Sequence, residues 1–154
     1  MIAQGVTLTI NPGVTVQFNE NQTLIVEGAI VADGDAGSEI TFTSSANKPA
    51  KGDWGTIRFN STTGVGSLFD HVIIEYGGAP NSEGNTGAMI SYRTGAYAFD
   101  LTNKTVRNSW GHGIDLRASS PLIDGSEFSN NNGYGVFSDL GLSYEIDNSV
   151  FCTF

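Results

Sequence analysis

One feature of the sequence constrains the fold more than any other, a motif that returns at a fixed spacing. Residues 111–116 (GHGIDL) are followed twenty-two residues later by residues 133–138 (GYGVFS). A further copy starts at residues 146–151 (IDNSVF), which match residues 123–128 (IDGSEF). A fixed period of this length is typical of repeat proteins, in which equivalent segments stack on one another.

The copies share a second property, the pattern of apolar residues within them. Each contains short runs in which apolar and polar residues alternate, and Gly and Asn separate these runs. Alternation of this kind is typical of short β-strands, and no window shows sustained helical periodicity. We therefore expect residues 1–154 to form a single all-β domain, a parallel β-helix (β-solenoid) of about six coils.

Stacked coils place equivalent residues above one another, so the sequence predicts which side chains line the interior. We expect three inward columns. The first contains Phe42, Ile74, Val106, Phe128 and Phe151; the second Ile57, Ile90, Ile114 and Val136; the third Phe69, Phe99, Ile123 and Ile146.

The charge of the chain limits the classes of partner that it can bind. The formal net charge is −9, with only seven Lys and Arg residues. Because no basic stripe is present to neutralise phosphates, we expect no nucleic-acid partner and no binding to an anionic membrane surface. Nothing in the sequence resembles a membrane span or a signal peptide, and we expect no membrane insertion. The single cysteine, Cys152, excludes a disulfide within the chain and a cysteine-built zinc site.

The two ends of the sequence are abrupt for a stacked fold. A strand pattern begins at residue 6, and the last residues stop part-way through a coil. Natural solenoids usually cap their terminal strand edges. We therefore expect the chain to be a segment of a longer protein, and we expect its open ends to allow copies to stack end to end.

Several segments resemble a known family. Residues 14–34, 40–44, 52–59 (GDWGTIRF) and 72–78 (VIIEYGG) are similar to the right-handed parallel β-helix repeat proteins of the pectin-lyase-like superfamily, found in secreted and surface proteins of bacteria and archaea. The resemblance covers most of the chain and implies a right-handed coil and an extracellular or cell-surface location. Members include polysaccharide lyases, hydrolases and epimerases, and also adhesins and surface-layer proteins.

His112 lies in a Gly-His-Gly motif that resembles one in polygalacturonase-type glycoside hydrolases. The Asn-Thr-Asp, Asp-Asp and Arg-Ile-Lys motifs of those enzymes are missing here, and glycoside hydrolysis needs two carboxyl groups across the scissile bond. The motif also returns one coil later with Tyr134 in place of His112. We therefore interpret it as a glycine-shaped corner and assign no catalytic residue.

Aspartates recur after inward apolar residues at Asp70, Asp100, Asp124 and Asp147. A ladder of carboxylates can collect calcium. Asp at a corner also accepts backbone N–H bonds and forms tight turns, and we favour that interpretation. We expect neither a metal site nor a cofactor.

The neighbours of the second inward column predict a candidate binding face, because side chains alternate along a strand. The first outward column contains Arg58, Ser91, Asp115 and Phe137, and the second contains Asn60, Arg93, Arg117 and Asp139. Arg forks suit carboxylates and sugar hydroxyls, and a Tyr92 or Phe137 ring could stack on a pyranose. The candidate carbohydrate-binding residues are Arg58, Tyr92, Arg93, Asp115, Arg117 and Asp139. Alternatively, these charges keep an exposed sheet soluble and in register.

A threonine face is a weaker alternative. The outward column Thr15, Thr41, Ile73, Thr105 and Glu127 begins like an ice-binding ladder but then loses its threonines. We expect a non-catalytic extracellular or cell-surface domain that binds polysaccharide or acts as an adhesive scaffold. The alternative is a polysaccharide-active enzyme of lyase, hydrolase or epimerase type, or a fragment of one.

Overall fold

The computed structural model describes residues 1–60, 66–80, 90–92, 101–117, 122–138, 145–147 and 150–152. These residues form strands, turns and bends, and none of them belongs to a helix. The described residues therefore contain no helix that could cross a membrane.

The strands are short, and their bounds follow the chain in this order: β1 Thr7–Ile10, β2 Thr15–Phe18, β3 Leu24–Val26, β4 Ala29–Asp33, β5 Ile40–Ser44, β6 Ile57–Phe59, β7 Leu68–Glu75, β8 Ile90–Tyr92, β9 Leu101–Arg107, β10 Ile114–Leu116, β11 Leu122–Asp124, β12 Glu127–Ser129, β13 Val136–Ser138, β14 Glu145–Asp147 and β15 Val150–Cys152. The described strands pair only in parallel.

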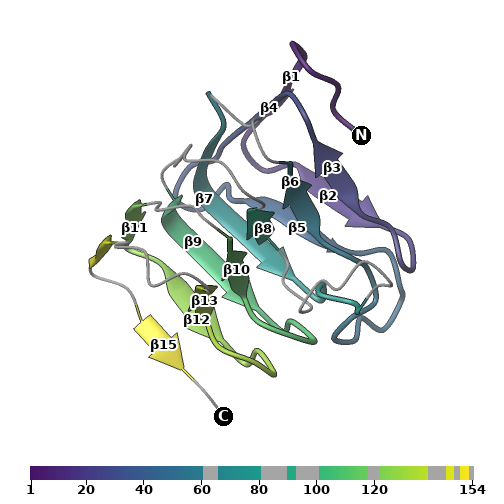
Figure 1. Ribbon diagram of the computed structural model, residues 1–154, viewed down its shortest axis with the longest axis vertical. Helices are drawn as coiled ribbons and strands as arrows, with labels where there is room; N and C mark the ends of the chain where they lie inside the picture. Colours follow the sequence, from purple (N-terminus) through teal and green to yellow (C-terminus); the bar gives the residue numbers. More distant parts are fainter. Residues whose placement is uncertain are drawn as a thin grey trace.

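Two parallel sheets face each other (Figure 1). One contains β3, β6, β8, β10 and β13. The other follows β1, β4, β7, β9, β11 and β14. In it β5 pairs with the second half of β7 and with β2, and β12 pairs with the second half of β9 and with β15. Strands that neighbour each other in space come from successive passes of the chain, from one end of the stack to the other (Figure 1). This pairing fits a β-solenoid and confirms the all-β, parallel prediction.

The first two inward columns have the predicted register. Phe42 pairs with Ile74, Ile74 with Val106, and Val106 with Phe128. These four side chains are buried. In the other sheet Ile57, Ile90, Ile114 and Val136 align in the same way.

The third column needs one correction. Phe69 and Ile123 both pair with Leu101, so Leu101 and not Phe99 occupies this position. The strands explain the change: β7 and β9 are continuous through both columns, so the spacing between the columns must be equal in the two strands. Phe99 itself lies outside the described residues.

Aromatic packing joins the two sheets in one core. The ring of Phe69 lies 6.0 Å from that of Phe42, in the same sheet, and 6.2 Å from that of Phe59, in the facing sheet. Trp54 is fully buried and stacks on Phe18 at 4.3 Å. Each such ring contributes about 1.5–3 kcal/mol by leaving water, so the core rather than any single strand stabilises the stack.

Residues whose backbone has the left-handed conformation (positive φ) form two corners of the stack. His71 and Asn103 have φ angles of 47° and 50° and stand level with each other, and Gly125 continues this position at 56°. Tyr76, Asn108 and Asn130 occupy a second such position. Asn tolerates this conformation better than most residues, which explains why Asn recurs at the corners.

Residues 46–53 form a loop that we call the strap, because it reaches across the stack. The Lys51 Nζ donates hydrogen bonds to side-chain oxygens of Asn130 and Asn132, at 3.1 and 2.9 Å. Gly52 donates its N–H to the carbonyl oxygen of Tyr76 at 3.2 Å. The strap therefore ties β5 to the corner after β12, across the two intervening strands β7 and β9.

Candidate functional site

The predicted outward columns are tested in part by the register. Arg58, Ser91, Asp115 and Phe137 stand level in β6, β8, β10 and β13, as predicted. Arg93 and Asp139 lie outside the described residues. Tyr92 pairs with Phe59 and Leu116, both of which are buried. A role in ligand binding for these residues stays a prediction.

Asp115 and Arg117 form a two-point ion pair on the outer side of β10. The Arg117 Nε donates to Asp115 Oδ1 at 2.8 Å, and its Nη2 donates to Oδ2 at 3.0 Å. Asp115 lies in β10 and Arg117 directly follows its last residue, two positions further on, so both side chains point to the same outer side. The Asp115 side chain is only 2% exposed, whereas that of Arg117 is 32% exposed. The guanidinium therefore covers the carboxylate and engages both its oxygens.

Three aromatic rings meet beside this pair. The His112 ring lies 4.6 Å from Phe137 and 5.5 Å from Tyr134, with interplanar angles of 6° and 11°. Tyr134 and Phe137 are 6.3 Å apart, so both rings lie on the same side of His112. The Arg117 guanidinium carbon stands 5.9 Å from the Phe137 ring centroid, within reach of a cation–π contact.

The backbone fixes the state of His112. The Tyr134 N–H donates to His112 Nδ1 at 3.0 Å, so this nitrogen is an acceptor and carries no proton. Burial lowers the pKa of His112 below its ordinary value; Asp115 opposes this shift and Arg117 adds to it. His112 is therefore neutral at pH 7.

The repeat brings these rings together. Gly113 donates its N–H to the carbonyl oxygen of Tyr134 at 2.8 Å, and Gly133 donates to the carbonyl oxygen of Gly111 at 2.9 Å. A Cβ at Gly133 would lie 2.4 Å from His112 Nδ1. The glycines thus allow one copy of the motif to lie directly on the next. This contact supports the interpretation of Gly-His-Gly as a corner.

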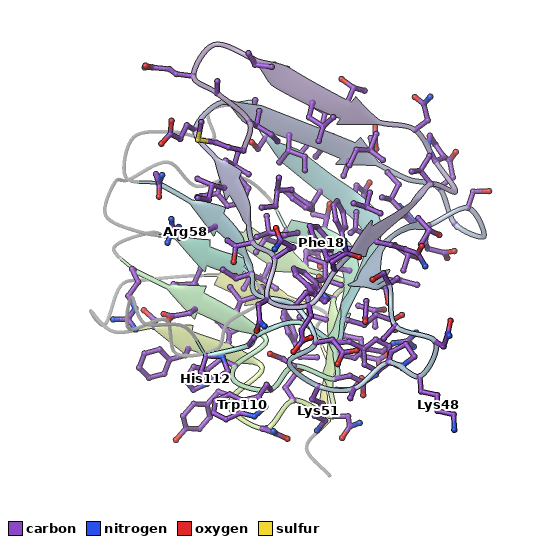
Figure 2. The ribbon with its side chains drawn as sticks, turned by 90° about the vertical axis from the view of Figure 1, so that its right-hand side faces the viewer. Phe18, Lys48, Lys51, Arg58, Trp110 and His112 are labelled. Atoms are coloured by element: carbon purple, nitrogen blue, oxygen red, sulfur yellow. The ribbon has the colours of Figure 1, made fainter. Side chains whose placement is uncertain are left out.

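Trp110 belongs to the same surface and was not singled out by the sequence analysis. Its side chain is 47% exposed, and that of Tyr134 is 66% exposed. Gly52 of the strap lies against Trp110, since a Cβ there would be 3.1 Å from the Trp110 Cβ. Figure 2 shows His112, Trp110 and Lys51 near one another along the lower edge of the molecule. The sequence feature that could have pointed to Trp110 is an aromatic residue next to a repeat corner. We call Trp110, His112, Tyr134 and Phe137 the aromatic corner.

The predicted aspartate ladder is also corrected by the register. Asp70 and Asp124 pair with Thr102, and Asp124 pairs with Asp147. Thr102 therefore replaces Asp100, which lies outside the described residues.

Asp70 has the corner role predicted for it. Its Oδ1 accepts hydrogen bonds from the Thr102 hydroxyl, the Asn103 side-chain amide and the His71 N–H. Burial raises the pKa of Asp70, but the bonds from Asn103 and Thr102 outweigh it and hold that pKa below its ordinary value.

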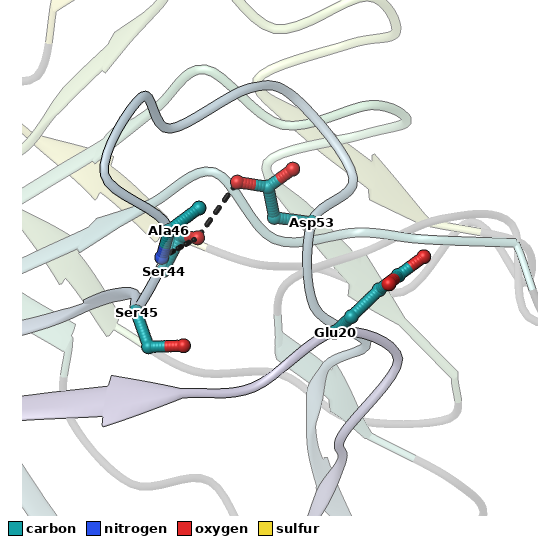
Figure 3. Close-up of a pocket in the computed structure, with 5 residues that line it drawn as sticks. All are labelled: Glu20, Ser44, Ser45, Ala46 and Asp53. Atoms are coloured by element: carbon teal, nitrogen blue, oxygen red, sulfur yellow. Dashed lines mark hydrogen bonds between the residues drawn. The ribbon is translucent and has the colours of Figure 1, made fainter.

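A small polar hollow opens where the strap leaves β5 (Figure 3). Its volume is about 190 Å³, and Glu20, Ser44, Ser45, Ala46 and Asp53 line it. The Ser44 hydroxyl donates to Asp53 Oδ2 at 2.7 Å, and the Ala50 N–H donates to the same oxygen at 3.0 Å. The Asp53 carboxylate therefore closes the strap. Within the described part of the chain, no three His, Cys, Asp or Glu side chains are placed to hold a metal ion.

Comparisons of the chain with protein-family models, with curated proteins and with solved structures find no match. The fold and the aromatic corner define the class: an all-β protein with parallel sheets that fit a β-solenoid, carrying exposed rings at one corner.

Proposed function

We propose that this chain is a right-handed parallel β-helix domain of about six coils, of the pectin-lyase-like kind, outside or on the surface of a cell. Its function is to bind carbohydrate without turning it over, as a binding or adhesive scaffold. The resemblance of residues 52–59 and 72–78 supports the class. Function has to be argued from the site, because one fold hosts many functions.

The exposure of Trp110 and Tyr134 carries this proposal. Trp is highly buried on average in folded proteins, and exposed apolar surface that is gathered in one place is typical of a binding site. At this corner 47% of Trp110 and 66% of Tyr134 remain exposed. Their rings combine an apolar face with a polar edge, which suits a pyranose with its C–H faces and rim of hydroxyls. His112 stacks on Tyr134 at 5.5 Å, and Gly52 of the strap lies against Trp110.

The same geometry favours binding over catalysis. Both oxygens of Asp115 accept bonds from Arg117, and Nδ1 of His112 accepts the Tyr134 N–H. A general acid or base needs a group free to exchange a proton with the substrate. These two groups are engaged within the protein, so a polysaccharide-active enzyme is the second candidate.

Affinity electrophoresis against a panel of neutral and acidic polysaccharides tests the proposal. We expect at least one polymer to retard the wild-type chain and Tyr134→Ala or Trp110→Ala to remove most of the retardation. Val6→Ala is the control, because Val6 is 52% exposed on β1's side of the stack, away from the corner. Retardation by no polymer would exclude carbohydrate binding. Release of new reducing ends from the bound polymer would favour the enzyme instead.

A further inference from the structure

We infer that the aromatic corner selects a neutral polysaccharide and rejects an acidic one of the same backbone; this inference rests on the proposed function. A surface that recognises uronates or sulfates needs cations that are free to pair with them. The charged groups around the aromatic corner do not meet this requirement.

The cation beside the rings, Arg117, is already committed to the protein. Its Nε and Nη2 donate to the two oxygens of Asp115 at 2.8 and 3.0 Å, and Asp115 is 2% exposed. A ligand carboxylate that took these donors would deprive a buried aspartate of its two hydrogen bonds from Arg117, which is unfavourable. The pair therefore presents a compensated surface, to which an acidic sugar gains little.

The ring that could acquire a charge, His112, is held neutral by geometry. Its Nδ1 accepts the Tyr134 N–H, and its face covers Phe137 at 4.6 Å. A proton on Nδ1 would break that hydrogen bond. The corner thus offers ring faces and neutral polar edges near Trp110 and Tyr134.

The strap adds no net positive charge. Lys48 and Lys51 stand on it, and Glu20 and Asp53 line the hollow at its base. The Lys51 ammonium has three donors and uses two of them on the oxygens of Asn130 and Asn132. Its remaining N–H suits a sugar hydroxyl as a single hydrogen-bond donor.

The whole chain reinforces this local balance. Its formal net charge of −9 repels a polyanion over the range of the Debye length, about 10 Å at 0.1 M salt. A neutral chain meets no such barrier. Stacking on apolar ring faces also needs C–H-rich sugar faces, which equatorial hydroxyls leave open, so a β-1,4-linked glucan or a close relative is the expected ligand class.

A matched pair of polymers tests the inference directly. Hydroxyethylcellulose and carboxymethylcellulose share one backbone and differ in charge. We expect the first to retard the full chain, with an apparent affinity that changes less than twofold between about 20 and 500 mM salt, because no ion pair is screened. We expect the second to bind at least tenfold more weakly at low salt. The same comparison is made with neutral and oxidised, uronate-bearing forms of any other polymer that binds in the panel.

The outcomes separate this inference from the proposed function. Equal or tighter binding of the acidic polymer, lost in Tyr134→Ala, would overturn the neutral selectivity and leave carbohydrate binding intact. Absence of binding by every polymer would overturn both.

A variant supplies an independent check. Asp115→Asn removes the negative charge that compensates Arg117, so it should gain affinity for carboxymethylcellulose, at least threefold at low salt. Lys48→Gln, on the exposed part of the strap, should not change the ratio of the two affinities. If Asp115→Asn does not fold, the salt dependence of the wild-type chain decides: a steep loss of binding with salt would contradict the inference.

Discussion

The backbone N–H of Tyr134 donates a hydrogen bond to Nδ1 of His112 at 3.0 Å, from one copy of the repeat to the copy before it. Tyr134 and His112 occupy the same position in the two copies and stack at 5.5 Å. The side chain of one copy therefore satisfies the backbone of the next, and several measurable properties depend on this contact.

His112→Tyr should fold, because tyrosine occupies the same position one repeat later and retains a ring to cover Phe137. It loses one acceptor for the Tyr134 N–H, and we expect a fall of about 1 kcal/mol in the free energy of unfolding. His112→Ala also loses the stacking, worth about another 0.5–1.5 kcal/mol. Urea denaturation followed by tryptophan fluorescence measures both. Failure of His112→Tyr to fold would contradict the repeat alignment.

The stability of the chain should depend on pH through His112. Its folded-state pKa is lowered from 6.5, mainly by burial. Between this value and the lower folded pKa, the unfolded chain binds more protons than the folded one. The contribution of His112 is therefore complete above pH 6.5 and declines as the pH falls through the window below it. Urea midpoints measured from pH 8 to pH 5 should show this decline.

His112→Gln provides the control for the pH series, because an amide oxygen can accept the Tyr134 N–H but does not titrate. Its midpoints should lack the part of the decline that belongs to His112. An identical decline in the variant would assign the pH dependence to other groups. The lowered pKa of Asp70 acts at more acidic values, below its ordinary 3.8, and so does not interfere.

The two members of the Asp115–Arg117 pair should respond unequally to mutation. Arg117→Leu removes the two-point pair with Arg117 from a carboxylate that is 2% exposed, and we expect a loss of about 3 kcal/mol. Asp115→Asn leaves a guanidinium that is 32% exposed and can turn to water, so about 1 kcal/mol is expected. Thermal unfolding of both variants and of the double variant measures this asymmetry. Equal losses would mean that Asp115 is resolvated more easily than its burial implies.

Gly52→Ala tests whether the strap positions Trp110. Gly52 has a φ of 85°, and an added Cβ would lie 3.1 Å from Trp110. Gly37 shares that φ but has open space around it, so Gly37→Ala reports the backbone strain alone, about 1–2 kcal/mol. Gly52→Ala should cost about 1 kcal/mol more and should shift the fluorescence of Trp110. Identical behaviour of the two variants would show that the strap does not position Trp110.

Leu101→Ala tests the corrected third column. Leu101 is fully buried between Phe69 and Ile123, and such truncations cost about 2–5 kcal/mol. Thr105→Ala, on the outer side of the same strand, should cost less than about 1 kcal/mol. A small effect of Leu101→Ala, measured by urea denaturation, would place another residue in the column.

The alternation of apolar and polar residues allowed the stacking to be predicted even where the spacing between coils varies. The columns through Phe42 and Ile57, and the outward column from Thr15 to Glu127, have the predicted register. The predicted third column passed through Phe99, although Ile74 and Val106 give a spacing of thirty-two that also joins Phe69 to Leu101. Continuity of β7 and β9 enforces this spacing, and a residue-by-residue pattern does not show it.

The candidate site was less accessible to sequence reasoning. Alternation predicted that Asp115 and Phe137 share an outward column, and they do. It did not predict that Arg117 would cover Asp115, because two long side chains on the same outer side can equally turn to solvent. The contact of Gly52 with Trp110 joins segments far apart in the chain. No local pattern reports such a contact, so the place of Trp110 beside the strap emerges only from the structure.

The twenty-two-residue repeat has a consequence for how this molecule changes over generations. Residues 111–116 lie on residues 133–138 without a break in the pairing of β10 and β13. A tandem duplication of one such unit in the gene would therefore lengthen the protein by one strand spacing, about 4.8 Å, and leave the core continuous. It would also copy the ring at position 112 or 134. The size of the aromatic surface can therefore change by one repeat at a time, through duplication rather than through point substitution.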